Sequence, residues 1–163
     1  MTGEFVLIND NIIPADSALV SVKDLAIQRG YAIFDFFKLV DGKAIFLDDH
    51  LDRFYHSAAI MRLPVKQSRA ELKELLFSLI LKNNLPNSGV RLTLTGGYSE
   101  DGFNLATPNL FITQQEFKIN PEVALTGTSL VSYSHQRQFP DVKTIDYLMA
   151  IWLKDYIIEH QTD

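Results

Sequence analysis

Two basic side chains in this sequence stand where they could take part in chemistry. Lys143 directly precedes a long apolar stretch. Burial at the edge of such a stretch lowers the pKa of a lysine toward the neutral amine, which can attack a carbonyl and form a Schiff base. Arg53 follows His50 by three residues, and its guanidinium suits a phosphate because it donates several charge-assisted hydrogen bonds. By residue type alone, Lys143 could equally be a solvated lysine at a helix start, and Arg53 could pair with a neighbouring aspartate.

Other polar residues give weaker indications. Arg91 shares one face of a predicted strand with Thr93 and Thr95, where it could bind a substrate carboxylate or simply face solvent. His50 and His56 are six residues apart, which is not the i, i+4 spacing of a helical zinc pair, so we expect no metal. The sequence has no P-loop, G-x-S-x-G, H-E-x-x-H or G-x-G-x-x-G motif.

The composition excludes several classes of protein. The chain has 163 residues with 15 basic and 20 acidic side chains, and the basic ones are scattered. Nucleic acid is therefore not an expected partner, because phosphate neutralisation requires a concentrated basic face. The longest apolar run, at 75–81, contains a serine and is far shorter than the ~20 residues that cross a bilayer, so we expect no membrane helix. The N-terminus does not resemble a signal peptide and there is no cysteine, which favours a cytoplasmic chain.

Turn signals and apolar runs predict two hairpins and a further pair of strands. Asp10-Asn11 lies between two apolar runs and predicts a hairpin that ends at Pro14. Asp41-Gly42 separates AIFDFFKLV from KAIFL and predicts a second hairpin. Polar atoms stand among aromatic residues on both faces of the strand at 32–40, so we expect it to border a pocket or a second layer. The segments VRLTLTGG at 90–97 and NLFIT at 109–113 predict a further strand pair.

Two helices are predicted between these strands. The first is expected to be capped by Asp48 or Asp49 and to continue until Leu63, just before a proline. The second begins with the capping box SRAE at 68–71 and frays at the asparagine pair at 83–84. Both predicted helices carry apolar residues at helical spacing, as a helix packed on a sheet requires.

The last third of the chain is expected to be a separate unit. Pro121 lies in the best linker candidate, and 123–133 resembles a strand. A helix from Thr144 to about His160 is apolar on nearly all sides, so it requires neighbours on more than one face. The predicted fold is α+β. A small domain at 1–117 combines an antiparallel sheet with two helices, a linker covers 118–124, and residues 125–163 form the first strand and helix of an incomplete large domain.

These segments, in this order, resemble the N-terminal part of the fold-type IV pyridoxal-phosphate enzymes. That group comprises branched-chain aminotransferases, D-amino acid aminotransferases and aminodeoxychorismate lyase. The most specific pieces are His-x-x-Arg at 50–53 and Lys-Thr-x-x-Tyr-Leu at 143–148, and the resemblance extends over essentially the whole chain. It implies a pyridoxal 5'-phosphate cofactor, amino acid and 2-oxo acid substrates, and a homodimer.

The resemblance also implies roles for individual residues. Lys143 matches the lysine that forms the internal aldimine and shuttles a proton, and Arg53 matches the arginine that binds the cofactor phosphate. Tyr147 matches a tyrosine near the phenolic oxygen of the cofactor, although by itself it is only a helix residue. Phe34 matches an aromatic wall of the substrate pocket. Arg91 matches an arginine that receives a second carboxylate in some branched-chain enzymes.

Some residues depart from the family pattern. The usual G-D-G-V-F-E is GYAIFD here, Asp146 replaces an asparagine, and Gly96 stands where D-amino acid aminotransferases carry an arginine. Family members also continue well past residue 163. We therefore expect a truncated class IV aminotransferase of the branched-chain type, inactive or nearly so by itself. The alternatives are aminodeoxychorismate lyase, which releases pyruvate, and a non-catalytic interaction module. A metal-dependent hydrolase is the weakest of the alternatives.

Overall fold

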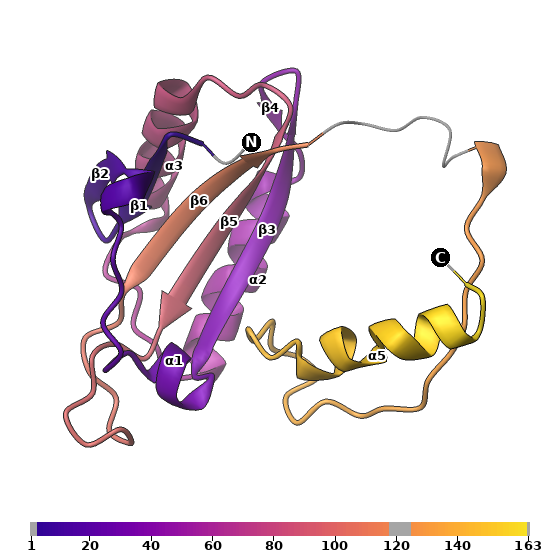
Figure 1. The fold of residues 1–163 in the computed structure, drawn as a ribbon. Helices are drawn as coiled ribbons and strands as arrows, with labels where there is room; N and C mark the ends of the chain where they lie inside the picture. Colours follow the sequence, from indigo (N-terminus) through magenta and orange to yellow (C-terminus); the bar gives the residue numbers. More distant parts are fainter. Residues whose placement is uncertain (1–2, 118–124, 163) are drawn as a thin grey trace.

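An antiparallel sheet of six strands, covered on one face by two helices, dominates the computed structural model, which describes residues 3–117 and 125–162 (Figure 1). The strand order is β2-β1-β6-β5-β3-β4. The strands are β1 (Phe5–Ile8), β2 (Asn11–Pro14), β3 (Ala32–Val40), β4 (Lys43–Ala44), β5 (Ser88–Thr95) and β6 (Leu110–Glu116). The helices are the short 3-10 helix η1 (Ala15–Ser17), α1 (Leu25–Arg29), α2 (Leu47–Ile60), α3 (Arg69–Asn83) and α5 (Leu148–Glu159). The mixed architecture with an antiparallel sheet confirms the predicted fold class.

Both predicted hairpins are present. β3 and β4 are joined through Asp41 and Gly42, which have φ angles of 49° and 75°, as the two-residue turn predicted there requires. In the first hairpin the turn lies at Asn9 and Asp10, one residue earlier than predicted, because Asn9 adopts the left-handed conformation with φ of 57° and Asn11 already pairs in β2. Asparagine and aspartate both tolerate this conformation, so the sequence did not distinguish the two positions.

The start of α2 differs from the prediction. The helix begins at Leu47 after Phe46, which adopts a left-handed φ of 50° and makes no side-chain capping bond. Asp48 and Asp49 therefore lie in the first turn and do not cap the helix. Acidic side chains are favourable there because the first turn carries the positive end of the helix dipole. The helix ends at Ile60, short of the predicted Leu63.

The capping box of α3 is confirmed. The Ser68 hydroxyl accepts a hydrogen bond from the Glu71 N–H at 3.3 Å, and the Glu71 carboxylate accepts one from the Ser68 N–H at 2.7 Å. The helix ends before Asn84, which has a φ of 51°. These reciprocal bonds fix the start of α3 and its apolar stripe against the sheet.

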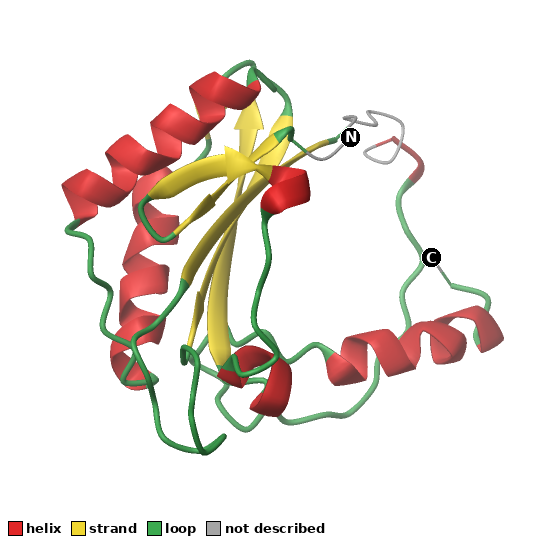
Figure 2. Cartoon of the chain, turned by 60° about the vertical axis from the view of Figure 1, so that its left-hand side comes forward, coloured by secondary structure: helices red, strands yellow, loops and turns green. Residues whose placement is uncertain are grey.

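The core lies between the sheet and the two long helices, which cover the same face (Figure 2). Burial of these aliphatic and aromatic side chains supplies the main stabilising free energy of the fold. The largest contributions come from fully buried residues of the sheet, α2 and α3: Leu7, Ile33, Phe37, Leu39, Leu51, Phe54, Leu72, Leu76, Leu79 and Leu92. β3 therefore has one face against α2, and on its other face Ala32 and Phe34 are buried whereas Phe36 and Lys38 are exposed.

The last third of the described chain differs from the prediction in part. The described residues 125–133 form no strand, and Leu125 and Leu130 are 87% and 84% exposed. The predicted strand is therefore wrong there. The physical reason is that a strand needs a neighbour for its backbone hydrogen bonds, and no described strand pairs with this segment. The predicted linker at 118–124 lies outside the described residues.

α5 is confirmed as a helix but is shorter than predicted, from Leu148 to Glu159. None of its residues is buried, and Figure 1 shows it beside the sheet rather than on it. Its large apolar side chains, Leu148, Ile151, Trp152 and Ile158, are exposed. Among the described residues, the Tyr133 ring meets Trp152 and Tyr156 of this helix edge-on, and this contact leaves the other apolar side chains uncovered. The division into domains at 1–117 and 125–163 stays a prediction.

Candidate active site

The first half of β3 has a free edge, and the segment that carries Lys143 runs along it. β4 pairs only with Leu39 and Val40. Further along the strand, the Phe34 N–H donates to the Lys143 carbonyl at 2.9 Å and the Ile145 N–H donates to the Ala32 carbonyl at 3.1 Å. A β-bridge joins Ile33 to Thr144. Residues far apart in sequence are thereby joined by backbone bonds, and Lys143 is held at the edge of the sheet.

Two further contacts dock this segment. The Lys143 N–H donates to the hydroxyl of Ser57, a buried residue of α2, at 3.3 Å. Val142 is only 2% exposed and belongs to the hydrophobic core. The backbone of Lys143 is thus bonded to β3 through its carbonyl and to α2 through its N–H. Its side chain makes neither of these bonds and remains available for chemistry.

Phe34 lies at the centre of the predicted site residues. Its ring centroid is 4.5 Å from the Lys143 Nζ and 4.0 Å from the guanidinium carbon of Arg91. The Tyr147 ring meets it edge-on at 5.5 Å. Both cations lie within the distance at which an aromatic ring attracts positive charge. The buried Phe34 ring thus contacts both the lysine and an arginine.

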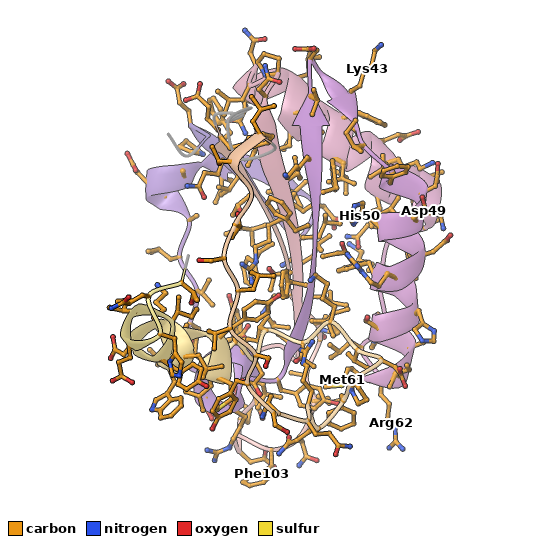
Figure 3. All side chains as sticks on the ribbon, turned by 90° about the vertical axis from the view of Figure 1, so that its right-hand side faces the viewer. Lys43, Asp49, His50, Met61, Arg62 and Phe103 are labelled. Atoms are coloured by element: carbon orange, nitrogen blue, oxygen red, sulfur yellow. The ribbon has the colours of Figure 1, made fainter. Side chains whose placement is uncertain are left out.

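A second cluster lies on the helix-covered face of β3. The Asp35 carboxylate accepts from Arg53 Nε at 2.7 Å and from Arg53 Nη2 at 2.8 Å, and His50 Nδ1 lies 2.8 Å from the same carboxylate. Figure 3 shows His50 between α2 and the sheet, whereas Arg62 at the end of the helix points away. The Asp35 side chain is 1% exposed and that of Arg53 is 47% exposed. A buried carboxylate is thus paired with a guanidinium that still reaches solvent.

The charges of this cluster are stabilised by their contacts. Burial raises the pKa of the Asp35 carboxyl, but hydrogen bonds from Arg53, His50 and the Phe36 N–H outweigh it, so the pKa is lowered overall. The hydrogen bond to Asp35 raises the pKa of Arg53, partial burial opposes this, and the charges of Asp35 and Tyr147 add to the rise. Both groups are therefore ionised at neutral pH. The two clusters are built on neighbouring residues of β3, Phe34 and Asp35.

The structure brings together four of the five residues singled out in the sequence. Lys143, Phe34, Arg91 and Tyr147 form the first cluster, whereas Arg53 belongs to the second, where its hydrogen bonds go to Asp35 and His50. The sequence reasoning missed the part played by Asp35. The available signal was a carboxylate in the middle of the apolar run AIFDFF, since a buried charge requires a partner.

In the sequence, His50 was weighed as a metal ligand and as part of the His-x-x-Arg motif; in the structure it contacts Asp35. The described residues contain no group of three histidine or acidic side chains that could hold a metal ion. In the same part of the chain, no helix is long and apolar enough to cross a bilayer.

A cavity of about 480 Å³ adjoins the edge of β3. Its lining includes Arg29, Tyr31, Arg137, Thr144, Tyr147 and Ile151. The Tyr31 hydroxyl donates to the Met61 carbonyl at 2.7 Å, and Arg137 donates to the Thr144 hydroxyl at 3.0 Å. The cavity therefore offers apolar walls with a few fixed polar groups next to Tyr147, as small-molecule sites do.

The donor set fits a phosphorylated carbonyl compound. Lys143 supplies a primary amine. The two clusters together hold three cations, Arg53, Arg91 and Lys143, and the carboxylate of Asp35. This excess of positive charge favours an anionic ligand. The amine can bond to a carbonyl carbon and the guanidinium can bind a phosphate.

Comparison with known proteins places the chain in a family. The family model described as amino-transferase class IV matches residues 32–163. The chain therefore belongs to the class IV aminotransferases.

Its relatives include D-alanine aminotransferases and branched-chain enzymes. It is 30% identical to D-alanine aminotransferase of Listeria monocytogenes over 82% of this chain and 43% of that protein. The Staphylococcus epidermidis D-alanine aminotransferase is also 30% identical, over 95% of this chain and 57% of the relative. Branched-chain amino acid aminotransferase of Escherichia coli shares the fold, with a TM-score of 0.86 at 23% identity, over 98% of this chain and 58% of the other. The chain thus spans about half the length of these relatives.

Proposed function

We propose that the protein takes part in pyridoxal-phosphate-dependent transamination, the transfer of an amino group between an amino acid and a 2-oxo acid. The observation that carries the proposal is that β3 holds both Lys143, whose Nζ lies against Phe34, and Arg53, whose guanidinium is bonded to Asp35, the next residue of the strand. These two groups suit the aldehyde and the phosphate of one small cofactor. Because the chain spans about half of its relatives, the proposal concerns the activity of a protein that contains these residues.

Each residue has a task in this proposal that follows from its position. When bound, the cofactor supplies an electron-withdrawing ring and accepts the amino group. Lys143 supplies the amine that bonds to the cofactor, and its Nζ carries the proton between substrate and cofactor carbon. Arg53 binds the phosphate with the part of its guanidinium that reaches solvent.

The remaining residues shape the substrate side. Phe34 forms a wall against which the Lys143 Nζ lies. Arg91 contacts the same Phe34 ring and is placed to bind a substrate carboxylate. Tyr147, whose ring meets Phe34 edge-on, would lie near the phenolic oxygen of the cofactor, as the family resemblance implies. Two cations against one aromatic ring, together with Arg53 on the neighbouring residue Asp35, support the binding of a ligand that carries both a phosphate and a carboxylate.

The substrate is open between two classes. The relatives at 30% identity are D-alanine aminotransferases, which favours a D-amino acid. Two observations favour a branched-chain substrate instead. Gly96 replaces the arginine that the family resemblance associates with D-amino acids, and the structural neighbours are branched-chain enzymes. We infer an amino acid with a small or branched apolar side chain, since the cavity beside Tyr147 has apolar walls. A homodimer is a further prediction of the family resemblance, and a cytoplasmic location stays an expectation drawn from the sequence.

A half-reaction tests the proposal in a full-length protein that contains these residues. That protein is loaded with pyridoxal 5'-phosphate, and D-alanine, L-leucine or L-valine is then added while the visible absorption of the lysine adduct is followed. We expect loss of the visible band and release of the matching 2-oxo acid, because the amino group passes to the cofactor.

The matched control compares two lysines. Lys143→Ala should remove both signals, and Lys154→Ala, a change on the exposed helix α5, should leave them intact. Equal activity in the two variants would contradict the role of Lys143. Release of pyruvate from aminodeoxychorismate without transfer of an amino group would assign the lyase reaction instead.

A further inference from the structure

We propose that Asp35 is a positioning residue that fixes the guanidinium of Arg53, so that one edge of it is held by protein and the remaining nitrogen is presented to the phosphate of a bound ligand. This inference rests on the proposed function, because it assigns the phosphate site of the same cofactor. It concerns a residue for which the sequence offered no role beyond a departure from the family pattern.

The bonds of Asp35 divide the Arg53 guanidinium into two parts. Nε and Nη2 donate to the two carboxylate oxygens at 2.7 and 2.8 Å. Nη1 has no hydrogen-bond partner among the residues that the structure describes. A bidentate pair of this kind fixes the plane of the guanidinium as well as its position. The N–H groups of Nη1 are thereby left for an outside anion.

The carboxylate is itself held firmly. Asp35 Oδ1 accepts from the N–H of Phe36 at 2.7 Å and lies 2.8 Å from His50 Nδ1. Its side chain is buried against α2, whereas the side chain of Arg53 is half exposed. The ion pair thus joins a rigid point on β3 to a flexible side chain on α2. A long arginine side chain loses much rotamer freedom when it binds a ligand, and this pairing removes most of that cost in advance.

The carboxylate also has an electrostatic cost. It cancels one positive charge beside the phosphate, so a variant without that charge would bind phosphate more tightly if attraction alone mattered. Positioning predicts the opposite result. In Asp35→Asn the side-chain amide presents N–H groups to the N–H groups of Arg53, and the bidentate pair is lost. The two explanations therefore predict changes of opposite sign.

The first experiment uses the chain without cofactor. The Nε–H signal of Arg53 is followed by nuclear magnetic resonance while inorganic phosphate is added. We expect a slowly exchanging Nε–H in the wild type and in Asp35→Glu. In Asp35→Asn we expect exchange faster by about tenfold and phosphate affinity lower by about tenfold, the scale on which losing an orienting partner weakens a ligand-binding group. Unchanged exchange, or phosphate affinity that stays equal or rises in Asp35→Asn, would overturn the inference.

A buried carboxylate elsewhere in the fold provides the matched control. Asp24 is fully buried and accepts hydrogen bonds from Thr95, Asn109 and the Ala26 N–H. Asp24→Asn should lower the stability of the fold, as Asp35→Asn does, but should leave the Arg53 signal unchanged. A loss of the signal in both variants would reduce Asp35 to a general structural role and overturn the inference.

The second experiment separates this inference from the proposed function. Binding of pyridoxal 5'-phosphate is compared with binding of pyridoxal, which lacks the phosphate. The preference for the phosphorylated compound should fall about tenfold in Asp35→Asn while the affinity for pyridoxal stays constant. If neither compound reacts with Lys143 in the wild type, the proposed function fails, and the inference is then decided by the phosphate titration alone. An unchanged preference in Asp35→Asn would contradict the inference while leaving the proposed function intact.

Discussion

Val142 docks the lysine-bearing segment onto the sheet, and its truncation should release that segment before the rest of the fold opens. The valine is buried in the core. Besides this side chain, the segment is held by the backbone bonds to Phe34 and Ala32 and by the bond to the Ser57 hydroxyl. Because these contacts are few, the segment should open locally, as weakly held segments do.

The magnitude follows from the buried groups that are removed. Val142→Ala deletes two methyl-sized groups, each contributing about 0.8 kcal/mol when buried, for a total of about 1.6 kcal/mol. Any cavity that fails to collapse adds to this loss. The population of the undocked segment should therefore rise roughly fifteenfold, since about 1.4 kcal/mol corresponds to a tenfold change in an equilibrium constant.

Hydrogen exchange measures this opening directly. The amides of Phe34 and Ile145 donate across the docked edge and should exchange about fifteenfold faster in Val142→Ala. Amides in the β5–β6 pair should change much less. Val90→Ala, at a buried position of β5, should instead destabilise the whole core. Equal acceleration at all these amides in Val142→Ala would refute local docking, as would unchanged exchange at Phe34.

Three further predictions concern stability. The pKa of Asp35 is lowered from 3.8, so the stability that its charge contributes is present above pH 3.8 and is lost as the pH falls through the lowered value. The difference in unfolding free energy between the wild type and Asp35→Asn, measured in urea, should therefore shrink with acidification. Ser68→Ala removes one half of the α3 capping box and should cost about 1 kcal/mol in the same assay, whereas no loss would show that the cap is unimportant. Gly97→Ala places a Cβ 2.1 Å from the Thr107 carbonyl oxygen at a φ of 81°, whereas Gly42→Ala at a φ of 75° meets nothing within 4 Å. Thermal unfolding should show a much larger loss of stability for Gly97→Ala, because both variants share the backbone strain but only this one has the clash. Equal losses of stability would contradict the clash.

Features encoded by neighbouring residues were predictable from the sequence. The Asp41-Gly42 turn and the Ser68–Glu71 capping box are decided within four residues, and both are confirmed. The start of α2 was not predictable in this way, because Phe46 takes a left-handed conformation without the residue type that usually marks one. A strand was predicted at 123–133, and it is absent from the described part because a strand depends on a neighbour elsewhere in the chain.

The same distinction between local and long-range features applies to the site. The resemblance to the family identified Lys143 and Arg53 as separate residues, but the position of Lys143 beside Phe34 depends on a backbone pairing between β3 and a segment about a hundred residues later. The role of Asp35 depends on α2 packing over β3, which brings His50 and Arg53 to a carboxylate on another element. Periodicity reports which face of an element is apolar and cannot show which partners meet there.

The most direct test of the account is to find where the cofactor bonds to the chain. The protein is incubated with pyridoxal 5'-phosphate, reduced with borohydride, digested and mapped by mass spectrometry. The account predicts one dominant phosphopyridoxyl adduct, at Lys143, which stands at the edge of β3 beside Phe34. An adduct spread over surface lysines, with Lys143 modified no more than Lys154, would contradict the central claim that this edge of the sheet is the cofactor site.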